Sequence, residues 1–185
     1  MKRLLLITGD LATGKSTFST ILSKRYGIAV FQKDTIKEIL GDRIGFRSRE
    51  ENKKLSHATI DIMCHIFKRI ASTGNDLILE ANFHEDELAK LHSIAGENGY
   101  AVLTLVLRAD IEIIYQRYLH RMREENRHPV HLATTFDVKD DFSRYVEECR
   151  KEHVIGQCLE IDASDFSYQE DSLISEKIDR FITKA

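Results

Sequence analysis

The chain has 185 residues and a mass of 21.3 kDa, the length of one domain that can bury a substantial core. Its composition, 42% hydrophobic and 31% charged, is that of a globular protein and excludes a disordered or fibrous one. The net charge of −3 gives no overall attraction to nucleic acid or to an anionic membrane, although a local basic patch can act alone.

The cysteines and the hydropathy pattern narrow the class of protein further. Cys64, Cys149 and Cys158 lack the spacing of a zinc site or of a disulfide framework, which favours a reducing compartment. No stretch approaches the ~18 consecutive apolar residues that a membrane span needs. We therefore expect a cytoplasmic protein with one domain over residues 1–185, no membrane contact and an oligomeric state that the sequence leaves open.

The first predicted elements are a strand at 3–8 and a helix at 15–26, joined by a turn that contains two glycines. The strand carries a short apolar run, Leu4 to Ile7, and the helix ends before Gly27. Residues 9–17 match the pattern G-x-x-x-x-G-K-[ST] in full. A strand, a glycine turn and a helix N-terminus in this order predict a phosphate-binding loop (P-loop) for a nucleoside triphosphate.

Each fixed position of this loop meets a need of a bound triphosphate. Two glycines let the backbone turn its N–H groups toward an anion, the lysine reaches the β- and γ-phosphates, and the serine hydroxyl can ligate Mg²⁺. Lys15 is therefore also a catalytic candidate and Ser16 a metal-ligand candidate. The candidate nucleotide-binding residues are Gly9, Asp10, Leu11, Ala12, Thr13, Gly14, Lys15, Ser16 and Thr17. We expect Ala12 to have a negative φ, which alanine adopts without strain.

A second predicted strand, at 28–32, is followed closely by Asp34. Ligands of open α/β sheets gather at the carboxyl ends of the strands, so Asp34 is a candidate for the general base that accepts a proton from an attacking hydroxyl. The alternative is that it only caps a helix that begins at Thr35. Further along, Arg43, Arg47, Arg49, Lys53 and Lys54 form a basic cluster that either flanks a substrate pocket or is ordinary surface.

A long amphipathic helix is predicted at 51–72, and a third strand at 76–81 ends in Glu80. An acidic residue after an apolar strand near a phosphate loop is placed to hold Mg²⁺ or its water, with Asn82 as a neighbour. The alternative is that Glu80 orients Lys15 or Ser16. A helix follows at 85–98.

After a fourth strand at 101–107, a helix that begins near Asp110 carries Arg117 and Arg121 beside its apolar stripe. Arg123, Arg127, His128 and His131 continue into a polar segment, 124–135, that we expect to be a loop because Pro129 prevents a regular helix. Fork-shaped guanidinium groups suit phosphate oxygens, although the same cluster suits a solvated face. Two histidines without a third ligand do not predict a metal site.

A helix at 141–152, a strand at 157–161 and a helix at 172–183 complete the chain. Strands that alternate with helices are typical of a parallel sheet covered by helices. The sequence thus predicts an α/β fold with a five-stranded parallel sheet.

The chain resembles the group of P-loop (AAA-type) kinases that includes polynucleotide 5′-hydroxyl kinases, chloramphenicol phosphotransferase-like enzymes and zeta-toxin-like kinases. The phosphate loop, Lys33-Asp34-Thr35, Glu80-Ala81-Asn82-Phe83 and the arginines from Arg117 to Arg127 carry the resemblance. It implies the P-loop kinase fold with a basic lid at about 117–135, ATP and Mg²⁺ as cofactors, and Asp34 as the general base. It also implies that Arg117 and Arg121 contact phosphates, and that adenine lies near Asp162-Ala163-Ser164.

The expected activity is transfer of the γ-phosphoryl group of ATP to a hydroxyl of a small molecule. Polynucleotide 5′-hydroxyl kinases usually have aspartate at position 80 and an arginine after Asp34, so nucleic acid is the less favoured acceptor. A nucleoside or nucleotide kinase, and a non-catalytic or ATPase-type switch, remain as alternatives. A GTPase is disfavoured because the chain has no N-K-x-D segment.

Overall fold

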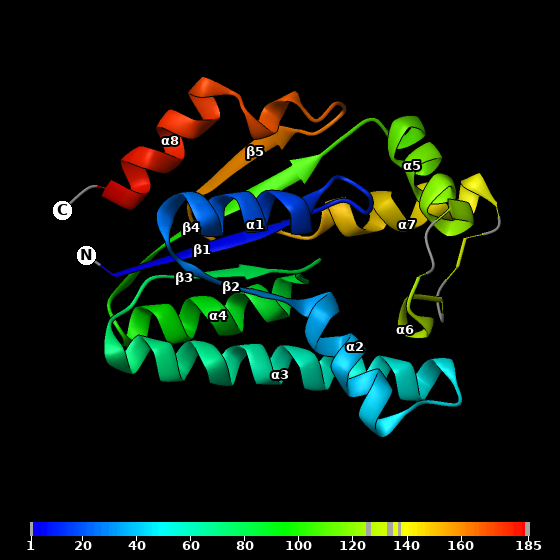
Figure 1. The fold of residues 1–185 in the computed structure, drawn as a ribbon, viewed down its shortest axis with the longest axis horizontal. Coiled ribbons are helices and arrows are strands. Elements are labelled where there is room, and N and C mark those ends of the chain that lie inside the picture. The colour runs from blue at the N-terminus through cyan, green and yellow to red at the C-terminus, as the bar shows by residue number, and fades with distance from the viewer. Residues whose placement is uncertain (1, 125–126, 133–134, 137, 184–185) are drawn as a thin grey trace.

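The computed structural model describes residues 2–124, 127–132, 135–136 and 138–183. Its centre is a five-stranded sheet in the order β2-β3-β1-β4-β5, in which every neighbouring pair is parallel (Figure 1). The strands are β1 (Lys2–Gly9), β2 (Ala29–Gln32), β3 (Leu77–Glu80), β4 (Tyr100–Arg108) and β5 (Cys158–Asp162). The predicted fold class, strand number and strand positions are confirmed.

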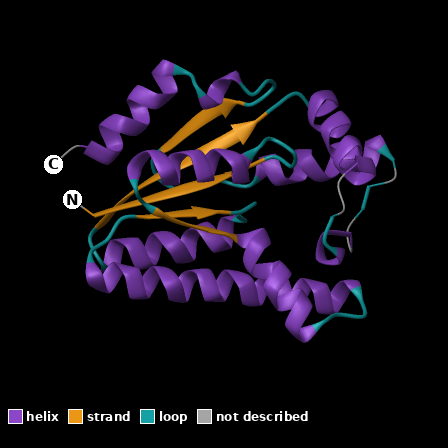
Figure 2. Cartoon of the chain, viewed as in Figure 1, coloured by secondary structure: helices purple, strands orange, loops and turns teal. Residues whose placement is uncertain are grey.

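Helices cover both faces of this sheet (Figure 2). They are α1 (Lys15–Tyr26), α2 (Lys33–Ile44), α3 (Arg49–Thr73), α4 (Glu85–Glu97), α5 (Ile111–Glu124), α6 (Pro129–Leu132), α7 (Lys139–Lys151) and α8 (Ser172–Thr183), with a 3₁₀ turn, η1 (Ser167–Gln169). The crossovers need helices because two parallel strands cannot be joined by a tight turn. Where the sequence predicts a helix, its bounds lie within two residues of the observed ones.

The central strand β1 shows why the sheet needs two covering layers. Leu4 and Leu6 point to the core under α3 and α4, while Leu5 and Ile7 point to the core under α1 and α8. All four side chains are at most 1% exposed. A strand buried on both faces reads as a continuous apolar run, which is the pattern that the sequence has at 4–7.

The helices α5 and α7 pack on one another near the carboxyl ends of the strands. Phe142 is fully buried, with its ring centroid 5.2 Å from those of Tyr115 and Tyr118. Such aromatic contacts add about 0.5–1.5 kcal/mol each beyond the area they bury. The cluster therefore holds the arginine-bearing helix α5 at the edge of the sheet where the strands end.

One local expectation about this edge is wrong, and one alternative is ruled out. The segment predicted as a loop contains α6, and Pro129 is its first residue, a position where the missing N–H of proline is not needed. The alternative concerns Asp34, which is not the cap of its helix: α2 begins at Lys33 with Gln32 as N-cap, and Asp34 lies in the first turn. The rest of the lid range falls partly on residues 125–126 and 133–134, outside the described residues.

Within the described ranges, no helix has the length and apolar character that crossing a bilayer requires.

The close approach of β1 to β4 generates the first prediction. Gly9 has a φ of 121°, and a Cβ added there would lie 2.1 Å from the carbonyl oxygen of Leu107. We expect Gly9→Ala to lower the free energy of unfolding by about 2–4 kcal/mol, because both backbone strain and overlap oppose it. Urea unfolding followed by circular dichroism measures the change.

Gly27→Ala is the matched control, since Gly27 has a φ of 66° and nothing lies within 4 Å of an added Cβ. Its free energy of unfolding should fall by only about 1 kcal/mol, because the left-handed backbone at Gly27 is the sole source of strain. Equal losses in the two variants would contradict the steric role of Gly9.

Candidate active site

A loop between β1 and α1 forms the floor of the site. Gly14 is the N-cap of α1 with a φ of 86°, and it turns the chain so that Lys15 begins the helix. The loop is fixed from behind by the Tyr168 hydroxyl, which donates to the carbonyl of Thr13 at 2.9 Å. Its backbone N–H groups thus lie at a helix N-terminus, an arrangement that favours anions.

The backbone at Ala12 departs from the expectation. Its φ is +57°, so the predicted negative φ is wrong and the residue lies in the left-handed region. A β-carbon in that region costs roughly 1–2 kcal/mol, which the surrounding loop contacts have to offset. The tight turn of the loop, and not the preference of alanine, decides this conformation.

The ammonium group of Lys15 is enclosed by the loop. It donates to the carbonyl of Gly9 at 3.2 Å and to that of Asp10. Burial lowers the pKa of Lys15 below its usual value, while the nearby carboxylates of Glu80 and Asp34 oppose that shift. A buried cation with this surrounding is poised to receive a strongly negative ligand.

Ser16 and Glu80 meet at the edge of the sheet. Parallel pairing of Ile7 with Glu80 brings the end of β3 beside the loop, and the Ser16 hydroxyl donates to Glu80 Oε2 at 3.0 Å. Burial raises the pKa of Glu80, and the charge of Lys15 opposes this. The hydrogen bond agrees with the alternative in which Glu80 orients Ser16, and it holds the hydroxyl oxygen of Ser16 beside the carboxylate of Glu80.

This pair fits Mg²⁺ in its donor chemistry. The hydroxyl and carboxylate oxygens are hard ligands, and Mg²⁺ commonly takes only one or two protein ligands beside phosphate oxygens and water. Among the described residues, no group of three or more histidine, cysteine or acidic side chains gathers as a metal site. A metal at Ser16 and Glu80 would therefore need the phosphates of a nucleotide to complete its ligands.

Asp34 reaches the same cleft from α2, the helix that follows strand β2. β2 is separated from β1 by β3, so the chain does not bring Asp34 to the loop by direct strand pairing. The first turn of α2 does so, and Asp34 lines the cleft together with residues 11–17 and Glu80. Asp34 is exposed, and it does not cap the helix. Its carboxylate is therefore available to a ligand.

The two leading arginines of α5 have different surroundings. Arg121 lies near enough to Lys15 and Glu80 to influence the pKa of each. Arg117 donates to the carbonyls of Ala163 and Ser164, both at 2.7 Å, and its guanidinium lies 4.2 Å from the ring centroid of Phe166. Both arginines line the cleft, and their contact with phosphates stays a prediction.

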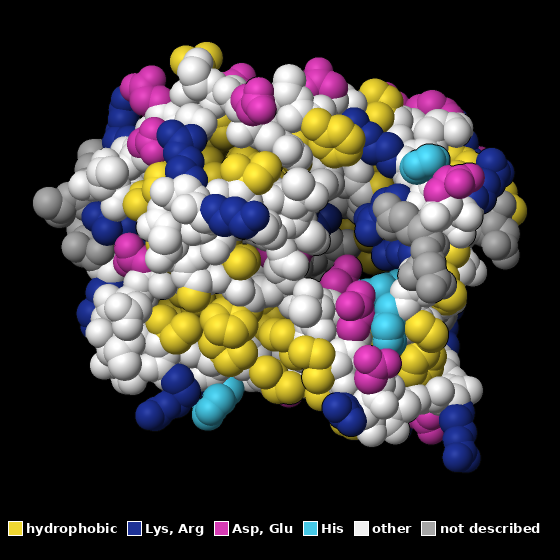
Figure 3. Space-filling view, viewed as in Figure 1, with side chains coloured by type: hydrophobic (Ala, Val, Ile, Leu, Met, Phe, Trp, Pro, Cys, Tyr) yellow, Lys and Arg dark blue, Asp and Glu magenta, His cyan; other side chains and the backbone are white. Residues whose placement is uncertain are grey.

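Only some of the remaining basic residues of the predicted lid reach the cleft. Arg127 and His131 line the cleft, whereas Arg123 and His128 do not. His128 Nε2 lies 3.0 Å from Asp42, and His131 Nε2 lies 2.8 Å from Glu38. His131 in α6 and His128 directly before it therefore link this segment to α2, and Figure 3 shows histidine beside acidic side chains where they meet.

A buried polar contact holds α6 from below. The Asn52 amide donates to the carbonyl of Val130 at 3.0 Å, and the Lys37 ammonium donates to Asn52 Oδ1 at 2.7 Å. Burial lowers the pKa of Lys37, and Asp34 opposes that shift. No sequence pattern indicated this network, since its members are 15 to 93 residues apart.

Arg150 is a second residue that pattern reasoning missed. It lies 2.6 Å from the Asp10 carboxylate, which also accepts from the N–H of Ala109 at 3.2 Å. The carboxylate of Asp10 thus faces α7 and β4, while its backbone belongs to the phosphate loop. Nothing in the spacing of two residues 140 apart could have indicated the pair.

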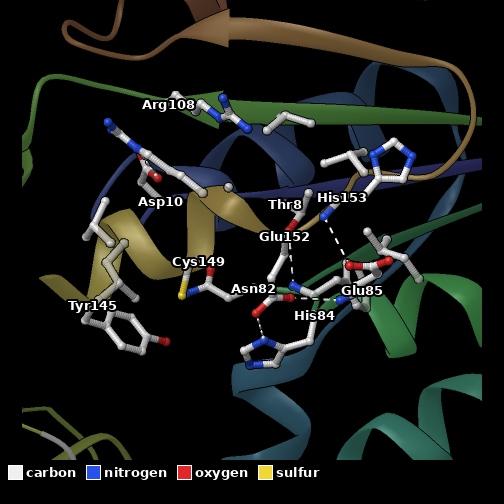
Figure 4. A pocket seen from close by; sticks show the side chains of 18 residues that line it. Thr8, Asp10, Asn82, His84, Glu85, Arg108, Tyr145, Cys149, Glu152 and His153 are labelled. Atoms are coloured by element: carbon white, nitrogen blue, oxygen red, sulfur yellow. Dashed lines mark hydrogen bonds and ion pairs between the residues drawn. The ribbon is translucent and has the colours of Figure 1, made fainter.

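A small pocket of about 60 Å³ lies behind the loop, where Gly9 and Asp10 line it (Figure 4). The His84 ring and Glu152 close one side at 2.8 Å, and Cys149 and Tyr145 come from α7.

The main cleft has a volume of about 1250 Å³, which is large enough for a nucleotide and a second molecule. Figure 3 shows the hollow with lysine and arginine side chains at its rim.

Comparisons with known proteins agree with this geometry. A family model described as an AAA domain matches residues 4–166. No curated protein sequence matches the chain.

Solved structures of P-loop kinases share the fold. A candidate kinase of Chloroflexus aurantiacus has 23% identity and a TM-score of 0.83, with 99% of each chain covered. The tunicamycin resistance protein of Deinococcus radiodurans has 17% identity and a TM-score of 0.65, over 100% of this chain and 98% of that one. Shikimate kinase of Bacteroides thetaiotaomicron has 15% identity and a TM-score of 0.60, over 98% and 97%. At these identities the likeness establishes the P-loop kinase fold.

The left-handed backbone at Ala12 generates the second prediction. Ala12→Gly should raise the free energy of unfolding by up to about 1 kcal/mol, because relief of strain exceeds the added entropy of the unfolded chain. Thermal and urea unfolding of the protein without nucleotide measure it.

Ala89→Gly, on the exposed face of α4, is the control, and it should lower the free energy of unfolding by about 0.5–1 kcal/mol. Destabilisation by both substitutions would show that Ala12 is not strained.

Proposed function

This chain belongs to the AAA domain family, and we propose that it is an ATP-dependent phosphotransferase that acts on a hydroxyl group of a small molecule. The observation that carries the proposal is the single cleft in which Lys15, the Ser16–Glu80 pair and Asp34 come together. These are a phosphate cradle, a metal position and a carboxylate base, the parts that phosphoryl transfer requires.

The loop and Lys15 bind the triphosphate in this proposal. Backbone N–H groups at the start of α1 hold its oxygens, and Lys15 exchanges its contacts with the carbonyls of Gly9 and Asp10 for the β- and γ-phosphates. Mg²⁺, when bound, supplies positive charge against the phosphate oxygens, and Ser16 and Glu80 hold it or its water. Negative charge from the phosphates also relieves the burial cost of the ammonium group.

Asp34 acts as the general base. Its carboxylate accepts the proton of the acceptor hydroxyl while that oxygen forms a bond to the γ-phosphorus and the bond to the β–γ bridging oxygen breaks. The ADP formed carries away the bonding electrons. Arg121, beside Lys15 and Glu80, is placed to stabilise charge on the transferring group.

The lid side of the cleft excludes water from this reaction. α6 is docked on α2 and α3 through the carbonyl of Val130, so the cleft has a wall on the side opposite the sheet. Removing water strengthens the electrostatic contacts and prevents transfer to water in place of the acceptor.

Phe166 and Arg117 form a platform for the nucleobase. The Phe166 side chain is 51% exposed, lines the cleft, and has the guanidinium of Arg117 over its ring. An exposed aromatic ring beside a phosphate loop offers a stacking surface to a base. The preceding residues, Ala163 and Ser164, use their carbonyls to hold Arg117, so the platform is rigid.

Replacement of the base is the third prediction. Asp34→Asn should lower kcat about 10²–10⁴-fold, because the amide cannot accept the proton, with little change in ATP affinity. The assay is phosphate transfer from γ-labelled ATP with Mg²⁺ to a panel of nucleosides, nucleotides, sugars, amino alcohols and a 5′-hydroxyl oligonucleotide.

Asp86→Asn, in the exposed first turn of α4, is the matched control and should keep full activity. Tight ATP binding without a labelled product in the unaltered protein would indicate a nucleotide-dependent switch instead, and labelling of the oligonucleotide alone would indicate a polynucleotide kinase.

Loss of the stacking surface is the fourth prediction. Phe166→Ala should raise KM for ATP roughly 5- to 100-fold with kcat nearly unchanged, since stacking on a base contributes about 1–3 kcal/mol. Leu173→Ala, an exposed apolar side chain on α8 away from the cleft, is the control. An unchanged KM in Phe166→Ala would place the base elsewhere.

A further inference from the structure

Beyond Asp34 the main cleft continues between α2 and the N-terminal half of α3. The α3 residues that line it are Arg49, Glu50, Asn52, Lys53, Ser56 and His57. Apart from Glu50, which is at the edge of the cleft, they recur at spacings of three and four, so they form one face of the helix. We call this part of the cleft the acceptor compartment, because it adjoins Asp34 on the side away from the phosphate loop.

Two carboxylates of this compartment, those of Glu87 and Glu50, already have partners within the protein. Glu87 accepts from the backbone N–H of His84 at 3.0 Å and lies 3.6 Å from the ammonium of Lys33. Glu50 pairs with Lys54 at 3.2 Å. The negative charge that lines the compartment is therefore largely compensated by the protein itself.

Arg49 and Lys53 differ from these residues. They lie one turn apart on the face of α3 that lines the cleft, and both side chains are exposed to it. Within the part of the chain that the structure describes, neither side chain forms a hydrogen bond or an ion pair. Two positive charges thus face the cleft, and neither is in an ion pair with a described residue.

Lys37 adds a buried positive charge to the same wall. It is one turn after Asp34 on α2, is only 9% exposed, and donates to Asn52 and to the carbonyl of Val130. Those partners are neutral, and the opposite charge that acts on Lys37 is that of Asp34. The compartment has the Asp34 carboxylate at the end nearest the phosphate loop. The unpaired cations Arg49 and Lys53 lie along α3, so the charge is distributed asymmetrically.

We propose that the acceptor is a small molecule that carries an anionic group, a carboxylate or a phosphate, in addition to its reacting hydroxyl. Arg49 and Lys53 bind the anionic group, and the hydroxyl is thereby directed to Asp34. This inference rests on the proposed function and specifies its substrate class. Small size follows from α6, which is held over this part of the cleft by Asn52 and Lys37.

The first test needs no knowledge of the acceptor. A cell extract freed of polymers by ultrafiltration is separated on an anion exchanger into a flow-through and a bound anionic fraction, and each is incubated with the protein, Mg²⁺ and γ-labelled ATP. We expect Asp34-dependent labelling of a compound in the anionic fraction. Labelling confined to the flow-through would overturn the inference and leave the proposed function intact.

Two further outcomes also decide the question. Labelling that occurs only with the retained polymers and disappears after nuclease treatment would assign a nucleic-acid acceptor and overturn the inference. Absence of Asp34-dependent labelling in every fraction would overturn the proposed function, and this inference with it.

The residues are tested with the labelled acceptor. The double variant Arg49→Gln/Lys53→Gln should raise KM for the acceptor about 10- to 100-fold, as expected for loss of charge-assisted hydrogen bonds, with kcat and KM for ATP nearly unchanged. Arg49→Lys with Lys53 retained should recover most of the affinity. The rise of KM with added salt should also be weaker in the double variant.

Lys68→Gln is the matched control, because Lys68 lies on the same helix, is exposed and does not line the cleft. Equal KM values in the double variant and in Lys68→Gln would overturn the assignment of Arg49 and Lys53. Both positions are exposed, so circular dichroism and the unchanged KM for ATP will show that the variants are folded.

Discussion

The buried ammonium group of Lys15 is the constraint on which the rest of the cleft depends. A charge removed from water is costly unless opposite charges or polar groups compensate it. Here the loop carbonyls contact the ammonium directly, and Glu80 and Asp34 act on it through their charge. The register of β1 against β3 and the first turn of α2 are the two features that bring those carboxylates to it.

The second organising feature is the polar contact between α2, α3 and α6. Lys37 and Asn52 are both buried, and together they hold the carbonyl of Val130. Unsatisfied buried polar groups are expensive, so these partners must be arranged together. As a result the helix that carries Asp34 and the segment that covers the cleft share one set of hydrogen bonds, which relates the position of Asp34 to that of the wall opposite it.

Much of the fold was predictable because its signals are local. The apolar run before Gly9, the helix at 15–26 and the alternation of strands with helices each depend on residues close in sequence, and the structure has all of them. The expectations that failed were also local rules, overridden by their context. Ala12 has a positive φ because the loop must turn there, and Pro129 begins a helix because it occupies a first position.

The sequence by itself determined that a phosphate loop, an acidic residue after the third strand and an aspartate after the second are present at the carboxyl edge of a parallel sheet. Only the tertiary structure decided the partners of their side chains. Asp10 is bound by Arg150, Arg117 lies against Phe166, and Arg49 and Lys53 face a cleft instead of plain solvent. The physical reason is range: backbone patterns follow from neighbouring residues, whereas these contacts join residues that only the folded core brings together.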